Sequence, residues 1–250
     1  MPQVTSIGDG AGRARVGWQD RRVRVPKEAP LNSPRPAAVL FDMDGTLVDS
    51  EKLWDVALQE LAAVYGGTLS DAARRAIVGT GMADAMRIVH DDLGQPERDP
   101  QASADWISAR ILDLFRTGLR WRPGALALLR AVRTAGIPTA LVTSSGRPLV
   151  EVALDTLGRD SFDAVVCGDE VGDPKPHPEP YLTAARLLDV PIERCVAIED
   201  SPTGVASALA AGAAVLAVPA EVPLPATDGV HQVESLTSAD LELLAALLNR

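Results

Sequence analysis

Short apolar segments alternate with segments of helical periodicity along most of the chain. Five apolar segments have the length and the unbroken hydrophobicity of buried parallel strands, namely residues 37–41, 139–142, 164–167, 195–198 and 215–218. Helices are predicted between or after them, at residues 124–135, 149–157, 180–188, 202–211 and 237–248. Strands that alternate with helices predict an α/β fold with a doubly wound, mostly parallel, Rossmann-like sheet.

One long segment between the first two predicted strands breaks this alternation. It reads as helical throughout, with helices predicted at residues 51–65, 71–78, 83–93 and 102–116. Trp54, Leu58, Leu61 and Tyr65 share one face of the first of these helices. We therefore predict an all-helical cap at 51–121, inserted into a Rossmann-like core made of residues 37–50 and 122–250.

The first 36 residues differ from the rest of the chain. Residues 1–36 lack periodicity, are rich in Gly, Pro and Arg, and hold seven basic against three acidic residues. The remainder of the chain is therefore more acidic than the formal net charge of −10 suggests. We expect a mostly disordered basic extension that precedes an acidic folded part.

The acidic balance excludes some classes of partner. A net charge of −10 argues against a general nucleic-acid binder or a binder of anionic membranes. No apolar run approaches the roughly 18 residues of a membrane span, and the N-terminus lacks an apolar signal core. Cys167 and Cys195 fall at apolar strand positions, which favours two buried thiols over a disulfide framework. We therefore expect a cytoplasmic protein that is a monomer or a weak dimer.

Two carboxylates follow the first predicted strand directly. Asp42 and Asp44 stand two positions apart, ahead of Gly45, which lets the backbone turn beside a ligand. Ligands gather at the carboxyl ends of strands in a doubly wound sheet. Two close carboxylates repel each other unless a cation or a shared proton stabilises them, and Mg²⁺ is commonly bound by one or two carboxylates plus phosphate. An acidic turn without a ligand is the alternative interpretation.

Hydroxyl groups and a lysine follow the next strands. Thr143 and Ser144 come after the strand at 139–142, where the start of a helix binds phosphate oxygens or is simply capped by a serine. Lys175 lies between prolines ahead of a helix. Such a lysine is either a fixed positive charge for a phosphate or an ordinary solvated loop residue.

Further acids end the strand at 195–198. Asp200 would complete a metal site with Asp42 and Asp44, whereas Glu199 is either another ligand or a residue that orients the ligands. The histidines lack metal-ligand spacing and are predicted to lie on the surface or behind the site: His90, His177 and His231.

These four motifs, in this order over residues 37–220, resemble those of the haloacid dehalogenase superfamily. The resemblance implies a Rossmann-like core whose first strand is central, with a helical cap inserted after that strand. It implies Mg²⁺ as cofactor and an aspartyl-phosphate intermediate on Asp42. The other implied roles are general acid/base and metal binding for Asp44, phosphate binding for Thr143 and Lys175, and metal binding for Asp200.

Within that superfamily the chain looks most similar to capped sugar-phosphate and hexitol-phosphate phosphatases. Residues 49–55 resemble their cap entry, and residues 175–181 resemble the segment around their lysine. The β-phosphoglucomutase relatives usually carry a His where this chain has Trp54, and a cap Arg where residues 78–84 have none. We therefore expect a Mg²⁺-dependent phosphomonoester hydrolase that acts on a small phosphorylated metabolite such as a sugar or polyol phosphate. A phosphomutase is the main alternative, and a non-catalytic binding module is a remote one because all four motifs are intact.

Overall fold

The computed structural model describes residues 35–77, 82–220 and 223–249. Six strands in these ranges form one sheet in the order β3-β2-β1-β4-β5-β6, and every neighbouring pair is parallel. The strands are β1 (Ala38–Phe41), β2 (Thr139–Val142), β3 (Ala164–Val166), β4 (Cys195–Glu199), β5 (Ala214–Ala217) and β6 (Val230–Gln232). The predicted doubly wound α/β fold is confirmed, with the first strand inside the sheet.

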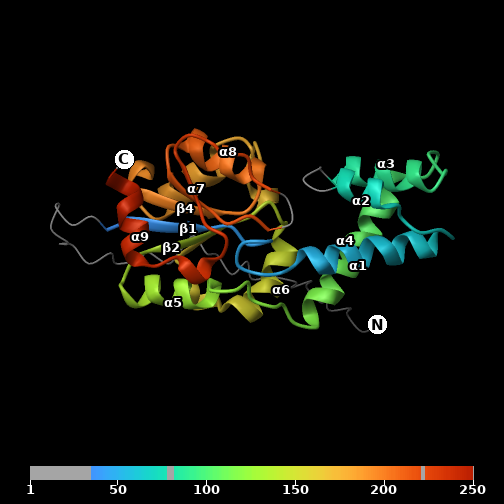
Figure 1. Ribbon diagram of the computed structural model, residues 1–250. Coiled ribbons are helices and arrows are strands. Elements are labelled where there is room, and N and C mark those ends of the chain that lie inside the picture. Colours follow the sequence, from blue (N-terminus) through green and yellow to red (C-terminus); the bar gives the residue numbers. More distant parts are fainter. Residues whose placement is uncertain (1–34, 78–81, 221–222, 250) are drawn as a thin grey trace, which may run out of the picture.

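Strand β1 contributes to two hydrophobic cores, one on each face of the sheet. Val39 and Phe41 belong to one core and Ala38 and Leu40 to the other, because successive strand residues point to opposite faces. The covering helices are α5 (Ala125–Thr134), α6 (Arg147–Leu157) and α9 (Leu241–Ala246) on the first face, and α7 (Glu179–Leu187) and α8 (Pro202–Ala211) on the second. Figure 1 shows α7 and α8 on one side of the sheet and α5 and α6 on the other.

The register of the central strands brings three strand ends together. Phe41 is level with Leu141 of β2 and with Ile198 of β4. The Asp42 N–H continues this ladder and donates to the Ile198 carbonyl at 3.0 Å. Residues that directly follow β1, β2 and β4 are therefore neighbours at one edge of the sheet.

Among the described residues between β1 and α5, the chain forms four helices, as the sequence predicts. They are α1 (Glu51–Val64), α2 (Asp71–Ile77), α3 (Met82–Asp92) and α4 (Pro100–Arg116). Figure 1 shows them beyond one end of the sheet, and we refer to α1–α4 as the cap. The prediction for His90 is wrong, because its side chain is buried in the cap and bonded to Ser103 at 2.8 Å.

The chain leaves for the cap and returns from it through two adjacent segments. Val48 and Trp121 form an antiparallel bridge. On either side of it, the Asp49 N–H donates to the Arg120 carbonyl at 2.9 Å and the Arg122 N–H to the Leu47 carbonyl at 2.8 Å. The beginning and the end of the cap are thus held together beside the end of β1.

Two details of the C-terminal part differ from the prediction. The sequence analysis missed β6, a strand of three half-exposed or exposed residues without an apolar run. The helix predicted at 237–248 is interrupted, because Ser235 starts a separate short 3₁₀ turn and the Asp240 side chain caps α9. The predicted disordered extension at 1–36 lies outside the described residues except for 35 and 36. In the ranges that are described, the helices are too short or too polar to span a bilayer.

Candidate active site

Asp42 lies directly after β1, is 6% exposed, and is paired with Lys175. The Lys175 Nζ donates to Asp42 Oδ1 at 2.8 Å, to the Val142 carbonyl at 2.9 Å and to Glu199 Oε1 at 2.6 Å. Burial alone would lower the pKa of Lys175, but the Asp42 and Glu199 carboxylates outweigh burial and raise that pKa. The ammonium of Lys175 is therefore a buried, fixed positive charge at the end of β1.

Glu199, the last residue of β4, is fully buried and accepts hydrogen bonds at both oxygens. Oε1 accepts from Lys175 and from the Tyr181 hydroxyl, each at 2.6 Å. Oε2 accepts from the Ser201 hydroxyl at 3.2 Å. A Cβ at position 204 would lie 2.0 Å from Oε1, so only Gly204 leaves room for this carboxylate. These contacts favour the interpretation that Glu199 orients its neighbours, above all Lys175.

Asp200 approaches the loop after β1 closely. The Thr46 hydroxyl donates to Asp200 Oδ1 at 3.2 Å. Gly45 has a φ of +77°, and a Cβ there would lie 2.1 Å from Asp200 Oδ2. Glycine at position 45 therefore permits both the left-handed turn and the close approach of the acid.

The Asp44 carboxylate accepts hydrogen bonds from three hydroxyl groups. Ser50 donates to Oδ1 at 2.6 Å, and Ser145 and Thr143 donate to Oδ2 at 2.7 Å and 3.3 Å. Thr143 is buried, whereas the Ser144 side chain, predicted to bind phosphate, is exposed. Ser145, which the sequence analysis did not select, is therefore the serine of this pair that bonds to Asp44.

The acids at this edge are crowded beyond what one lysine can neutralise. Burial, followed by the charges of Glu199 and Asp44, raises the pKa of Asp42 to about 7, with Lys175 acting in the opposite direction. Burial and the charges of Asp42 and Glu199 raise the pKa of Asp200 to about 9.

Among the described residues, the buried Asp42 Oδ2 has no hydrogen-bond partner. Carboxylate oxygens of Asp42, Glu199 and Asp200 lie within 4.8 Å of one another. The chemistry of this donor set, carboxylate oxygens crowded at one point, fits a hard divalent cation such as Mg²⁺. We call Asp42, Asp44, Lys175, Glu199 and Asp200 the strand-end site.

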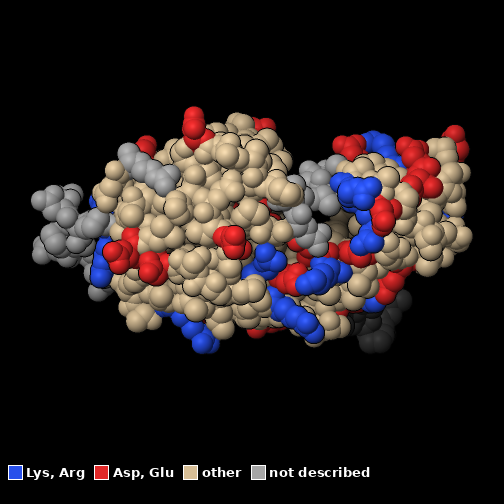
Figure 2. Space-filling view, in the orientation of Figure 1, with Lys and Arg blue, Asp and Glu red and all other residues tan. Residues whose placement is uncertain are grey.

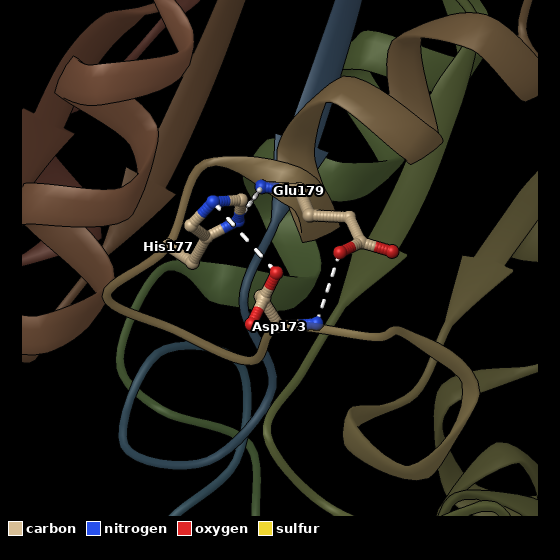
Figure 3. A group of neighbouring side chains, drawn as sticks. All are labelled: Asp173, His177 and Glu179. Atoms are coloured by element: carbon tan, nitrogen blue, oxygen red, sulfur yellow. Dashed lines mark hydrogen bonds and ion pairs between the residues drawn. The ribbon is translucent and has the colours of Figure 1, made fainter.

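A second group of potential ligands lies in the loop that carries Lys175. Figure 3 shows Asp173, His177 and Glu179 facing one another at the surface. The Glu179 oxygens already accept the N–H groups of Gly172 and Asp173, at 2.9 Å each. Because these oxygens are engaged by the backbone, the contacts indicate a role in holding the loop.

A cavity of about 790 Å³ lies within the cap. Its walls are mostly apolar and come from all four helices, including Trp54 of α1, Ile77 of α2, Met86 of α3 and Ile107 of α4. None of the strand-end residues lines it. Glu51 of α1 lines the cavity, and its charge also raises the pKa of Asp200. The wall that contains Glu51 therefore extends toward the strand-end site. We call this space the cap cavity. Figure 2 shows charged side chains gathered over the cap and its junction with the core.

Comparison with known proteins agrees with this geometry. Residues 36–212 match the family described as haloacid dehalogenase-like hydrolase. The chain belongs to that family. It is 33% identical over 215 residues to hexitol phosphatase A of Escherichia coli, covering 79% of this chain and 92% of that protein. It is 35% identical over 185 residues to protein CbbY of Cereibacter sphaeroides, covering 70% of this chain and 80% of that protein.

A solved structure is similar over most of the chain as well. It is a HAD hydrolase of family IA, variant 3, from Entamoeba histolytica, with a TM-score of 0.76 and 25% identity. The match covers 85% of this chain and 99% of that one. The predicted family is therefore confirmed, and with it an enzyme of the phosphatase type.

The sequence analysis found most of the strand-end site but missed the residues that hold it. Ser50 and Ser145 bind Asp44, and Tyr181 binds Glu199. A serine at a helix start is usually a cap, so neither serine carried a distinct signal. The signal at Tyr181 was a hydroxyl on the apolar face of a helix, since a buried hydroxyl needs a partner.

Proposed function

We propose that this protein hydrolyses small phosphomonoesters through a phosphoenzyme formed on Asp42. One observation carries the proposal. Asp42 Oδ1 is fixed by Lys175 while the buried Oδ2 has no hydrogen-bond partner among the described residues. A carboxylate held in this way is oriented for in-line attack on phosphorus.

The chain supplies the groups that each half-reaction needs. Asp42 forms a bond to phosphorus as the bond between phosphorus and the leaving oxygen breaks, and Asp44 gives a proton to that oxygen. In the second half, Asp44 takes a proton from water while the water oxygen attacks phosphorus, which releases phosphate and restores Asp42. Lys175 balances the negative charge of the transferred group. The Thr143 hydroxyl is the proposed phosphate contact from the end of β2.

The acidic residues fit Mg²⁺ as the cofactor. Asp42, Asp200 and the main-chain carbonyl of Asp44 are the proposed ligands, while Glu199 holds Lys175. When bound, Mg²⁺ neutralises charge on the phosphoryl oxygens and relieves the repulsion between the carboxylates.

The substrate is proposed to be a sugar or polyol phosphate, with the leaving group in the cap cavity. Hexitol phosphatase A of Escherichia coli is among the relatives, and the match covers 79% of this chain and 92% of that protein. The volume of about 790 Å³ lies in the usual range for small-ligand sites. Trp54 in its wall stands where the mutase relatives usually carry a His, which supports hydrolysis over phosphomutase chemistry.

The test is Mg²⁺-dependent release of phosphate from sugar, polyol, nucleotide and glycolate phosphates by the wild type and by Asp42→Asn. We expect the variant to lose about 10³-fold or more in kcat, because nothing replaces the nucleophile. Full activity in Asp42→Asn would exclude the proposed mechanism. Isomerised sugar phosphate formed after priming with a bisphosphate, without free phosphate, would instead identify a mutase.

A further inference from the structure

The loop that presents Lys175 has few hydrogen-bond donors of its own. We call residues 172–178 the lysine loop. Three of its seven positions are proline, which has no backbone N–H. The remaining N–H groups belong to Gly172, Asp173, Lys175 and His177. The His177 N–H donates to the Pro174 carbonyl at 2.9 Å within the loop, so few N–H groups are left to attach it to its surroundings. Its position therefore depends in part on side chains from neighbouring elements.

Glu179, the first residue of α7, provides one such contact. Its Oε1 accepts the Gly172 N–H and its Oε2 accepts the Asp173 N–H, both at 2.9 Å. These two bonds, visible in part in Figure 3, lower the pKa of Glu179 and keep it ionised at neutral pH. One carboxylate therefore fixes two consecutive peptide groups at the start of the lysine loop.

The other end of the lysine loop is fixed from α8. The Ser207 hydroxyl donates to the His177 carbonyl at 2.6 Å, and Ser207 is buried. Lys175 lies between the two fixed points, and its side chain is only 3% exposed. Movement at either end would therefore shift the Lys175 Nζ away from Asp42 and Glu199.

We propose that Glu179 is a positioning residue for phosphate binding, which acts by fixing the backbone of the lysine loop so that Lys175 meets the phosphoryl group. The inference rests on the proposed function, because it assumes that Lys175 contacts phosphate. An acid in the first turn of a helix also stabilises that helix through its dipole. The test must separate these two effects.

Glu242 is a matched control for the dipole effect. It stands in the first turn of α9 as Glu179 stands in the first turn of α7, and it is exposed. Glu179→Ala and Glu242→Ala should both lower the melting temperature slightly. Only Glu179→Ala removes acceptors from the lysine loop.

The experiment measures binding of inorganic phosphate by calorimetry, with saturating Mg²⁺, together with kcat and KM for p-nitrophenyl phosphate. We expect Glu179→Ala to raise the Kd of phosphate about tenfold, equivalent to about 1.4 kcal/mol, with a parallel rise in KM. Glu179→Gln, which keeps one acceptor oxygen, should raise the Kd about threefold. Glu242→Ala should leave the Kd within about twofold of the wild type.

Two results distinguish this inference from the proposed function. A wild type that binds phosphate but hydrolyses no ester would overturn the proposed hydrolase and leave the binding test in place. Unchanged phosphate affinity in Glu179→Ala, with a melting temperature lowered as in Glu242→Ala, would overturn the positioning role.

Discussion

The strand-end site and the cap cavity are built from opposite kinds of contact. In the strand-end site each carboxylate or ammonium is fixed by short polar contacts, such as those that join Lys175 to Asp42 and Glu199. The cap cavity is walled mainly by side chains without directional bonds, such as Trp54 and Met86. Directional bonds position reacting atoms within narrow limits, whereas apolar walls accept leaving groups of different shape. The chemistry and the choice of substrate thus depend on different physical interactions.

Among the changes that test this comparison, adding one methyl group beside Glu199 should have the largest effect. In Gly204→Ala the new Cβ would lie 2.0–2.1 Å from the Glu199 carboxylate, which must then move together with Lys175. We expect kcat/KM to fall about 100-fold, because displacements near 1 Å in a positioned site have such effects. Steady-state kinetics with p-nitrophenyl phosphate would measure this.

Gly67→Ala is the corresponding control in the cap. Its Cβ would meet the end of the flexible Leu93 side chain, which can rotate away. We expect less than about a twofold change in kcat/KM. Equal losses in both variants would remove the contrast between a rigid site and an adaptable cap.

Removing an apolar side chain from the wall of the cap cavity should weaken binding of the leaving group without affecting binding of phosphate. In Trp54→Ala we expect KM for a hexitol phosphate to rise about tenfold, while the affinity for inorganic phosphate stays unchanged, because none of the strand-end residues proposed to bind phosphate lines the cap cavity. Trp106→Ala is the control, since Trp106 packs on the hydrophobic core of the cap but does not line the cavity. A similar rise in KM in both variants would contradict a direct contact by Trp54.

The smallest effect expected here is the effect of metal removal on thermal stability, and it depends on pH. The folded-state pKa values of Asp42 and Asp200, about 7 and about 9, lie above the ordinary value of 3.8. Between pH 4 and 9 the folded protein therefore binds more protons than the unfolded chain, and its metal-free stability falls as pH rises. We expect Mg²⁺ to raise the melting temperature by a few degrees at pH 8.5 and by less at pH 6. A rise in melting temperature with Mg²⁺ that does not depend on pH would show that the metal does not relieve the repulsion between these carboxylates.

The sequence predicted the site best where an acidic or basic residue lies at or near the end of a predicted strand. Asp42, Lys175 and Asp200 follow or face buried strands, and the parallel register then brings them together. The contacts of Ser50 and Tyr181 depend on how helices pack against the sheet edge, which local periodicity does not specify. The cap cavity depends on the relative placement of four helices, so the sequence predicted the cap but not the space within it.

The bridge between Val48 and Trp121 has a consequence for how such a protein can be altered. Because the chain departs and returns through neighbouring positions, the cap resembles the domain insertions that natural folds tolerate. The cap helices can therefore be replaced as one segment. Grafting the α1–α4 segment of a relative between these two positions should transfer its substrate preference while the phosphate chemistry of the recipient stays the same.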